Sequence, residues 1–169
     1  EQKKQCFATK SGWVLENGAL TGNDNPNADP EILVAIGELA TSIGAADITE
    51  IEFITTAFDV SNGGTLQVRV RFNEAVDVTG TPQLTVVNDS RANHTLSYAS
   101  GTGSNELVFS LTIAAGGGGV IAADDELSIG ANATALNGGT IKDAGTNTAS
   151  TITNAASIGT AAGTITATA

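Results

Sequence analysis

The side chains that could perform chemistry in this chain are few and widely separated. His94 is its single histidine, and it lies in the polar stretch of residues 88–95 together with Asp89 and Ser90. A general base needs an orienting acid and an adjacent nucleophile in a defined geometry, whereas these residues share one predicted turn. We therefore interpret His94 as a solvated loop residue, and we expect neither a catalytic residue nor an enzymatic activity.

The densest acidic cluster is Asp124, Asp125 and Glu126. Ca²⁺ is the ion that such carboxylates would accommodate, but it takes six to eight oxygen ligands and three residues are visible here. The alternative is a turn whose acids face solvent. A second oxygen-rich loop holds Asn23, Asp24, Asn25 and Asp29. We expect no other cofactor.

Four consecutive glycines, residues 116–119, superficially resemble a phosphate-binding loop. A P-loop continues with Lys and Ser or Thr into a helix, and neither signal follows here. The sequence therefore predicts a flexible hairpin tip at this position.

The N-terminus combines lysines with aromatic residues. These residues are Lys3, Lys4, Phe7, Lys10 and Trp13. Aromatic and cationic side chains commonly anchor protein interfaces, so the segment is a candidate docking arm. The alternative is a frayed terminus with Trp13 packed on the adjacent domain.

The rest of the chain is strongly acidic. The whole sequence has a formal charge of −11, and from residue 11 onward only Arg69, Arg71, Arg91 and Lys142 are basic. Nucleic-acid binding requires clustered cations, so this composition argues against it. The longest apolar run, residues 32–36, is far shorter than the ~20 residues that a membrane span needs, and we expect no membrane insertion.

Apolar and polar residues alternate along short segments separated by Gly- and Asn-rich turns. This period of two indicates strands with one buried face. The predicted strands cover residues 48–55, 65–72, 75–78, 83–87, 95–99, 106–113, 126–129 and 140–142. Short strands at this spacing are typical of a sandwich, so we predict an all-β, Ig-like antiparallel β-sandwich.

The inward-facing positions of these strands predict the core. It consists of Ile51, Phe53, Leu66, Val68, Val70, Phe72, Leu84, Val86, Leu96, Tyr98, Leu107, Phe109, Leu111, Ile113, Leu127 and Ile129. We place the sandwich at residues 47–154, with a last strand near residues 150–154.

The segments on either side of the predicted sandwich lack its regular alternation of apolar and polar residues. Residues 1–46 form an N-terminal arm in which residues 7–16 could be one strand. Residues 30–43 match either a short helix or a hairpin partner for that strand. Residues 155–169 form a Thr- and Ala-rich tail with little apolar area to fix it.

Three stretches of the predicted sandwich resemble the Ig-like, cadherin-like repeat of large bacterial surface adhesins. They are FNEAVDVTGTPQLT at residues 72–85, SYASGTGSNELVF at residues 97–109 and ALNGGTIKDAG at residues 135–145. The resemblance covers about residues 59–153. The family's closing segment usually reads Asp-Ala-Ala-Gly-Asn, whereas residues 143–147 read Asp-Ala-Gly-Thr-Asn. In adhesin arrays such loops approach Ca²⁺ sites between repeats.

Single modules of this family also occur in virion proteins of tailed phages. Here the module appears once and follows an unrelated segment. We therefore expect a non-enzymatic virion structural protein, a phage capsid decoration protein at the virion surface. Its partners would be a protein lattice such as a major capsid protein, copies of itself, or a host surface. The alternative is a module of an extracellular, Ca²⁺-dependent bacterial cell-surface adhesin or filament.

Overall fold

The computed structural model describes residues 6–9, 12–15, 31–35 and 45–169. The chain divides into two compact units, Glu1–Ile43 and Gly44–Ala169. The first unit contains β1 (Cys6–Thr9), β2 (Gly12–Leu15) and β3 (Glu31–Ala35). These strands form an antiparallel sheet in the order β1-β2-β3.

The pairing in the N-terminal sheet contradicts the prediction of one strand over residues 7–16. It also shows which of the two structures predicted for residues 30–43 begins at residue 31. The single strand predicted over residues 7–16 was wrong, because Thr9 and Gly12 are partners across the β1–β2 ladder and the chain reverses between them. Glycine beside polar residues is typical of such a reversal. β3 pairs with β2, so residues 31–35 are the hairpin partner and not the start of a helix. Residues 36–43 lie outside the described residues.

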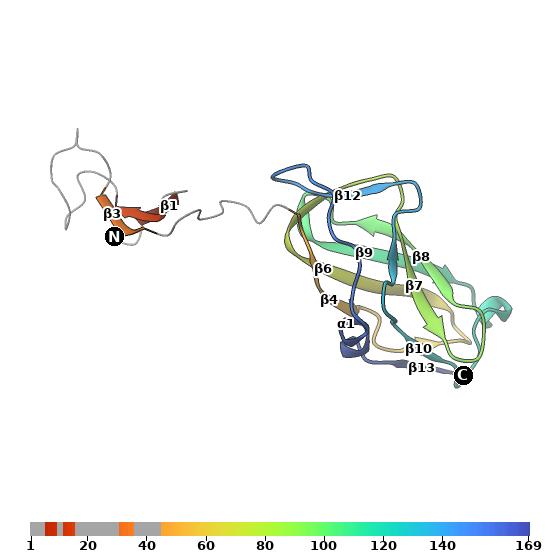
Figure 1. The fold of residues 1–169 in the computed structure, drawn as a ribbon. Coiled ribbons are helices and arrows are strands. Elements are labelled where there is room, and N and C mark those ends of the chain that lie inside the picture. Colours follow the sequence, from red (N-terminus) through yellow and green to blue (C-terminus); the bar gives the residue numbers. More distant parts are fainter. Residues whose placement is uncertain (1–5, 10–11, 16–30, 36–44) are drawn as a thin grey trace. The chain divides into compact units, whose positions relative to one another are not determined.

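The second unit is all-β and is built on a ten-stranded sheet that curls around its core (Figure 1). Its strands are β4 (Ile48–Phe53), β5 (Phe58–Asp59), β6 (Gly64–Thr79), β7 (Gln83–Asn88), β8 (His94–Ser100), β9 (Ser104–Ile113), β10 (Glu126–Ser128), β11 (Thr134–Ala135), β12 (Thr140–Asp143) and β13 (Ile165–Thr168). Every strand predicted over residues 48–142 overlaps one of these. The two predicted over residues 65–72 and 75–78 are one continuous strand, β6.

The pairing order makes this a single mixed sheet. Neighbours run β12-β6-β9-β8-β7-β10-β13-β5, with β4 added at β6 and β11 at β7. A sandwich would separate two layers, but β8 pairs with both β9 and β7, and Ser97 has a partner in each ladder. The only parallel ladder in residues 45–169 joins β13 to β5. The all-β prediction is confirmed, and a curled sheet takes the place of two stacked layers.

The core lies on the inner face of the curl, where alternation places it. On β6, Leu66, Val68, Val70 and Phe72 are at most 2% exposed, while the residues between them are half-buried. Burying one such side chain contributes roughly 1.5–3 kcal/mol relative to leaving it in water. Thirteen of the sixteen predicted core residues are buried, and the other three pack against the core half-buried. These three are Phe53, Tyr98 and Leu111.

Residues 155–169 belong to the second unit and differ from the tail that the sequence predicts. They form α1 (Ala156–Ala161) and β13, and Ile165 and Ala167 are buried in the core. β13 is fixed by ladders on both sides, so backbone pairing supplies what its small side chains do not. The strand expected near residues 150–154 is reduced to a single bridge between Asp47 and Thr151. No helix within the described ranges is long and apolar enough to cross a membrane.

Candidate functional site

A polar cluster, buried except for Arg91, lies where the end of β7 meets the start of β8 and the turn before β10. Its members are Asn88, Arg91, His94 and Asp125. Asn88, His94 and Asp125 are at most 4% exposed. Burying polar groups costs free energy unless they are hydrogen-bonded, so the partners of each group decide what the cluster can do.

Asn88 connects the other members of the cluster. Its Nδ2 donates to Asp125 Oδ2 at 3.0 Å and lies 3.4 Å from His94 Nε2. Its Oδ1 accepts the backbone N–H groups of Ser90 and Arg91 at 3.0 and 2.9 Å. This is the local bonding that makes Asn a turn residue. The amide therefore closes the turn after β7 and also ties that turn to the core.

Asp125 is held as a carboxylate by three donors. Besides Asn88, its Oδ2 accepts the Ala122 backbone N–H at 3.0 Å and Arg91 Nε at 3.1 Å. The hydrogen bond from Asn88, followed by those from Ala122 and Arg91, holds the pKa of Asp125 below its usual value although burial opposes this. Internal donors at Oδ2 therefore favour the ionised form of this buried carboxylate.

His94 is buried, so the prediction of a solvated loop histidine was wrong. It is the first residue of β8 and lies two positions before the core residue Leu96, so strand alternation turns it inward. Burial lowers its pKa, and the charge of Asp125 only partly offsets this. Ser90, the hydroxyl of the predicted polar turn, donates to Asp89 at 3.0 Å. This geometry binds loop to core and does not assemble a nucleophile with a base.

The candidate calcium ligands are not brought together. Asp125 points inward, whereas Asp124 and Glu126 are exposed. Within the described part of the chain, no group of three or more His, Cys, Asp or Glu side chains is placed to hold a metal ion. The second candidate loop, at residues 23–29, lies outside the described residues.

The candidate docking arm is described only in its backbone. Phe7 lies on β1 and Trp13 on β2, where they pair with Val14 and Ala8. Lys3, Lys4 and Lys10 lie outside the described residues. The prediction of a docking arm therefore stays a prediction.

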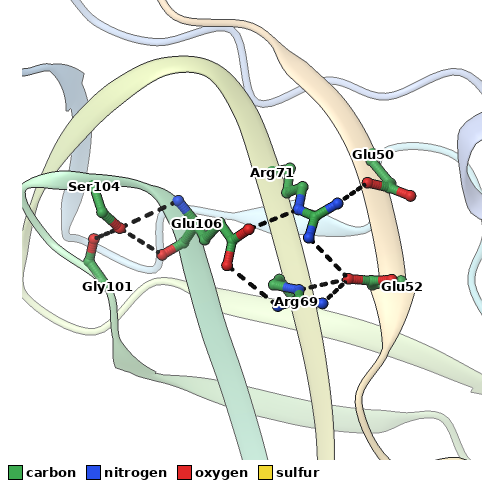
Figure 2. A network of polar contacts seen from close by, with 7 residues as sticks. All are labelled: Glu50, Glu52, Arg69, Arg71, Gly101, Ser104 and Glu106. Carbon is green, nitrogen blue, oxygen red and sulfur yellow. Dashed lines mark hydrogen bonds and ion pairs between the residues drawn. The ribbon is translucent and has the colours of Figure 1, made fainter.

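A ladder of charged side chains that the sequence analysis did not identify crosses the outer face of β4, β6 and β9 (Figure 2). Arg71 donates to Glu106 Oε1 at 2.8 Å and to Glu50 Oε2 at 2.7 Å. Arg69 bonds Glu52 and reaches Glu106 Oε2 at 3.2 Å. These hydrogen bonds raise the pKa of Arg71 and lower that of Glu106. The charged ladder links three adjacent strands by opposite charges. The signal in the sequence was the presence of opposite charges on the outward-facing positions of strands that could lie side by side.

Asp143 belongs to the segment where the adhesin-like repeat closes, and its carboxylate is also engaged internally. It is 1% exposed and accepts Thr146 N and Thr146 Oγ1 at 2.6 and 2.8 Å. A hydrogen bond with the Glu74 side chain is the largest cause that lowers the pKa of Asp143, followed by those from Thr146. This side chain fixes the turn after β12.

The hollows on the surface of the described residues include one beside α1 and one beside β8 and β9. One, of about 410 Å³, lies between β4 and α1 and includes Glu50 and Ile158 in its walls. The other, of about 370 Å³, lies between the start of β8 and the end of β9 and is lined mainly by apolar atoms. Its rim includes the glycine run, which is a short 3-10 turn, η2 (Gly117–Gly119), with Gly117 buried. The sequence predicted only a flexible tip there.

Comparison of the chain with protein-family models, curated proteins and solved structures finds no match. The functional argument therefore depends on the residues of this chain and their geometry. In the described residues, the histidine and the buried acids stabilise turns and connect strands.

Proposed function

We propose that this chain is a non-enzymatic structural protein of a virus particle, a capsid decoration subunit. Residues 1–43 bind a protein lattice, and the acidic β unit of residues 44–169 projects from it. The observation that carries the proposal is the division of the chain into a small unit and a larger unit with its own core. The resemblance of the larger unit to modules of virion and adhesin proteins supports the same role.

The distribution of charge supports this assignment of roles. Lys3, Lys4 and Lys10 are three of the chain's seven basic residues, and all lie in the first ten positions. Residues 45–169 carry four basic against twelve acidic residues, a formal charge of −8. A strongly acidic projecting unit repels its copies and keeps crowded subunits apart, while a basic segment steers toward an acidic surface.

Incorporation into particles tests the proposal. The full chain, or a variant that lacks residues 1–43, would be produced together with the other proteins of the virus that encodes it. The number of copies of each chain would then be measured in purified particles. We expect the truncated chain to be absent from particles while its melting temperature stays within a few degrees of that of the full chain, because the core lies in residues 44–169.

Charge variants refine this test. Lys3→Gln, Lys4→Gln and Lys10→Gln together should weaken incorporation most at low salt, where the attraction of the lysines is least screened, whereas Lys142→Gln, on β12, serves as the matched control and should not change it. Incorporation of the truncated chain at full copy number, or particles without the full-length chain, would overturn the proposal.

A further inference from the structure

The β8–β9 seam is the place where two neighbouring strands of the curled sheet part. β8 and β9 pair at Ser97–Ser110, Tyr98–Phe109 and Ser100–Val108, and their ladder ends there. β8 nevertheless continues back to His94 along β7, and β9 continues to Ile113 along β6. Between these two free stretches lies the hollow of about 370 Å³.

Backbone groups of β8 point into the seam. Thr95 is the partner of Thr85 on β7, and the Thr85 N–H donates to Ala133 O at 2.9 Å, away from β8. In an antiparallel ladder, partners that do not bond each other both direct their N–H and C=O groups outward. The N–H and C=O of Thr95 therefore face β9.

The same argument holds on the other side of the seam. Thr112 is the partner of Thr65 on β6, and Thr65 O accepts the Thr55 hydroxyl at 3.0 Å, away from β9. The N–H and C=O of Thr112 therefore face β8. Within the described part of the chain, the β8–β9 ladder stops at Ser97 and Ser110 and pairs neither Thr95 nor Thr112 across the seam. The seam thus presents two facing strand edges, and such edges pair with an added strand.

The side chains of the seam define what kind of strand fits. Its lining contains no Asp, Glu, Lys or Arg, although the unit around it is strongly acidic. Val120, at the rim, is 47% exposed and is one of three large apolar side chains that the described residues leave exposed. A charged side chain entering the seam would lose its water without gaining a partner, which is unfavourable. Neutral, β-branched side chains match this lining.

We propose that the β8–β9 seam binds an extended, uncharged peptide segment, which adds as a strand between Thr95 of β8 and Thr112 of β9. The free stretches cover three residues on each strand, residues 94–96 and 111–113, so about three to five residues of the segment engage. Burial keeps the pKa of His94 below its usual value, so the neutral ring in the wall is compatible with an uncharged segment. This inference does not depend on the proposed virion role.

A tethered probe tests the inference. The C-terminus lies near the seam, because Thr168 O accepts Val60 N–H at 2.9 Å and Val60 O accepts Gly116 N–H at 2.8 Å. The sequence Thr-Val-Thr-Val-Thr-Val would be fused after Ala169 through a flexible Gly/Ser linker, which supplies an effective concentration in the millimolar range. The matched control replaces the valines of the fused peptide by proline, which cannot donate a hydrogen bond.

Amide hydrogen exchange of the monomeric fusion, followed by NMR, is the readout. We expect exchange at Thr95 and Thr112 to slow by on the order of tenfold in the Thr/Val fusion and to stay unchanged in the proline control. Val120→Asp at the exposed rim should reduce this protection without unfolding the chain. The inference is overturned if both amides are already protected in the unfused chain, if the two fusions behave alike, or if protection appears only at another strand edge.

Discussion

At the scale of single residues, His94 is the group whose protonation we expect to weaken the second unit between pH 7 and pH 5. The ring is buried beside Asn88, with Asp125 and Arg91 as the charged groups of the same cluster. Burial lowers its pKa, so the folded state favours the neutral ring, while the unfolded chain binds a proton with a pKa of about 6.5. The stabilisation is therefore complete above that pH and is lost as the pH falls below it.

We therefore predict that the free energy of unfolding falls between pH 7 and pH 5, by at most about 1.4 kcal/mol per pH unit for one proton. His94→Gln keeps an acceptor near Asn88 but cannot titrate, so its stability should change less over this interval. Urea denaturation at several pH values measures both slopes. Equal slopes for the two proteins would contradict the prediction, since Asp125, whose pKa is lowered, loses its contribution only at more acidic pH.

The polar cluster shows what the sequence could and could not predict about single residues. His94 lies two positions before the core residue Leu96, so both side chains point to the same face of a strand. Starting the predicted strand one residue earlier, at residue 94, would have predicted a buried His94. The burial of Asp125 had no such signal. Its partners Asn88 and Arg91 are more than thirty positions away and meet it only because β10 pairs with β7. Local patterns cannot report a long-range contact of this kind.

At the scale of elements, α1 is held against the sheet by a close backbone approach. A Cβ atom on Gly159 would lie 2.3 Å from Ile129 O and 2.6 Å from Gly130 O. Neither carbonyl can move without disturbing the segment after β10. We predict that Gly159→Ala displaces α1 and lowers the free energy of unfolding by about 1–3 kcal/mol, the usual cost of overpacking, as measured by chemical denaturation.

The chain offers a matched control for this prediction at Gly130. A Cβ there would meet only Val87 Cγ2 at 3.9 Å, so Gly130→Ala adds the same methyl group where there is room. We expect it to be neutral or to stabilise the fold by a few tenths of a kcal/mol, because alanine restricts the unfolded chain. Equal destabilisation by both substitutions would refute the role of the close approach.

The elements that the sequence predicted most fully are those whose period of two runs over several large apolar residues, as in β6 and β9. The missed strands β5 and β11 have two residues each, and β13 has one large side chain, Ile165. Their place depends on ladders formed with distant strands. Local patterns could not predict the single curled sheet either. It depends on β8 pairing with β9 along one edge and with β7 along the other.

At the scale of the whole molecule, two electrostatic effects oppose each other. Residues 45–169 carry a formal charge of −8, which disfavours compactness through self-repulsion. The charged ladder on β4, β6 and β9 is attractive, but its partners are in direct contact. Salt screens separations beyond the Debye length, about 30 Å at 0.01 M and 8 Å at 0.15 M, before it affects contacts. The long-range repulsion is therefore screened first.

We accordingly predict that raising NaCl from 10 to 150 mM increases the melting temperature by roughly 2–4 °C, the shift that about 1 kcal/mol produces in a chain of this size. Millimolar CaCl₂ added at 150 mM NaCl should give no further increase, because Asp125 and Asp143 already bind internal donors and Asp124 and Glu126 stand apart from them. MgCl₂ is the control for divalent charge. A saturable gain with Ca²⁺ alone, reversed by a chelator, would contradict this prediction and favour the calcium-dependent adhesin.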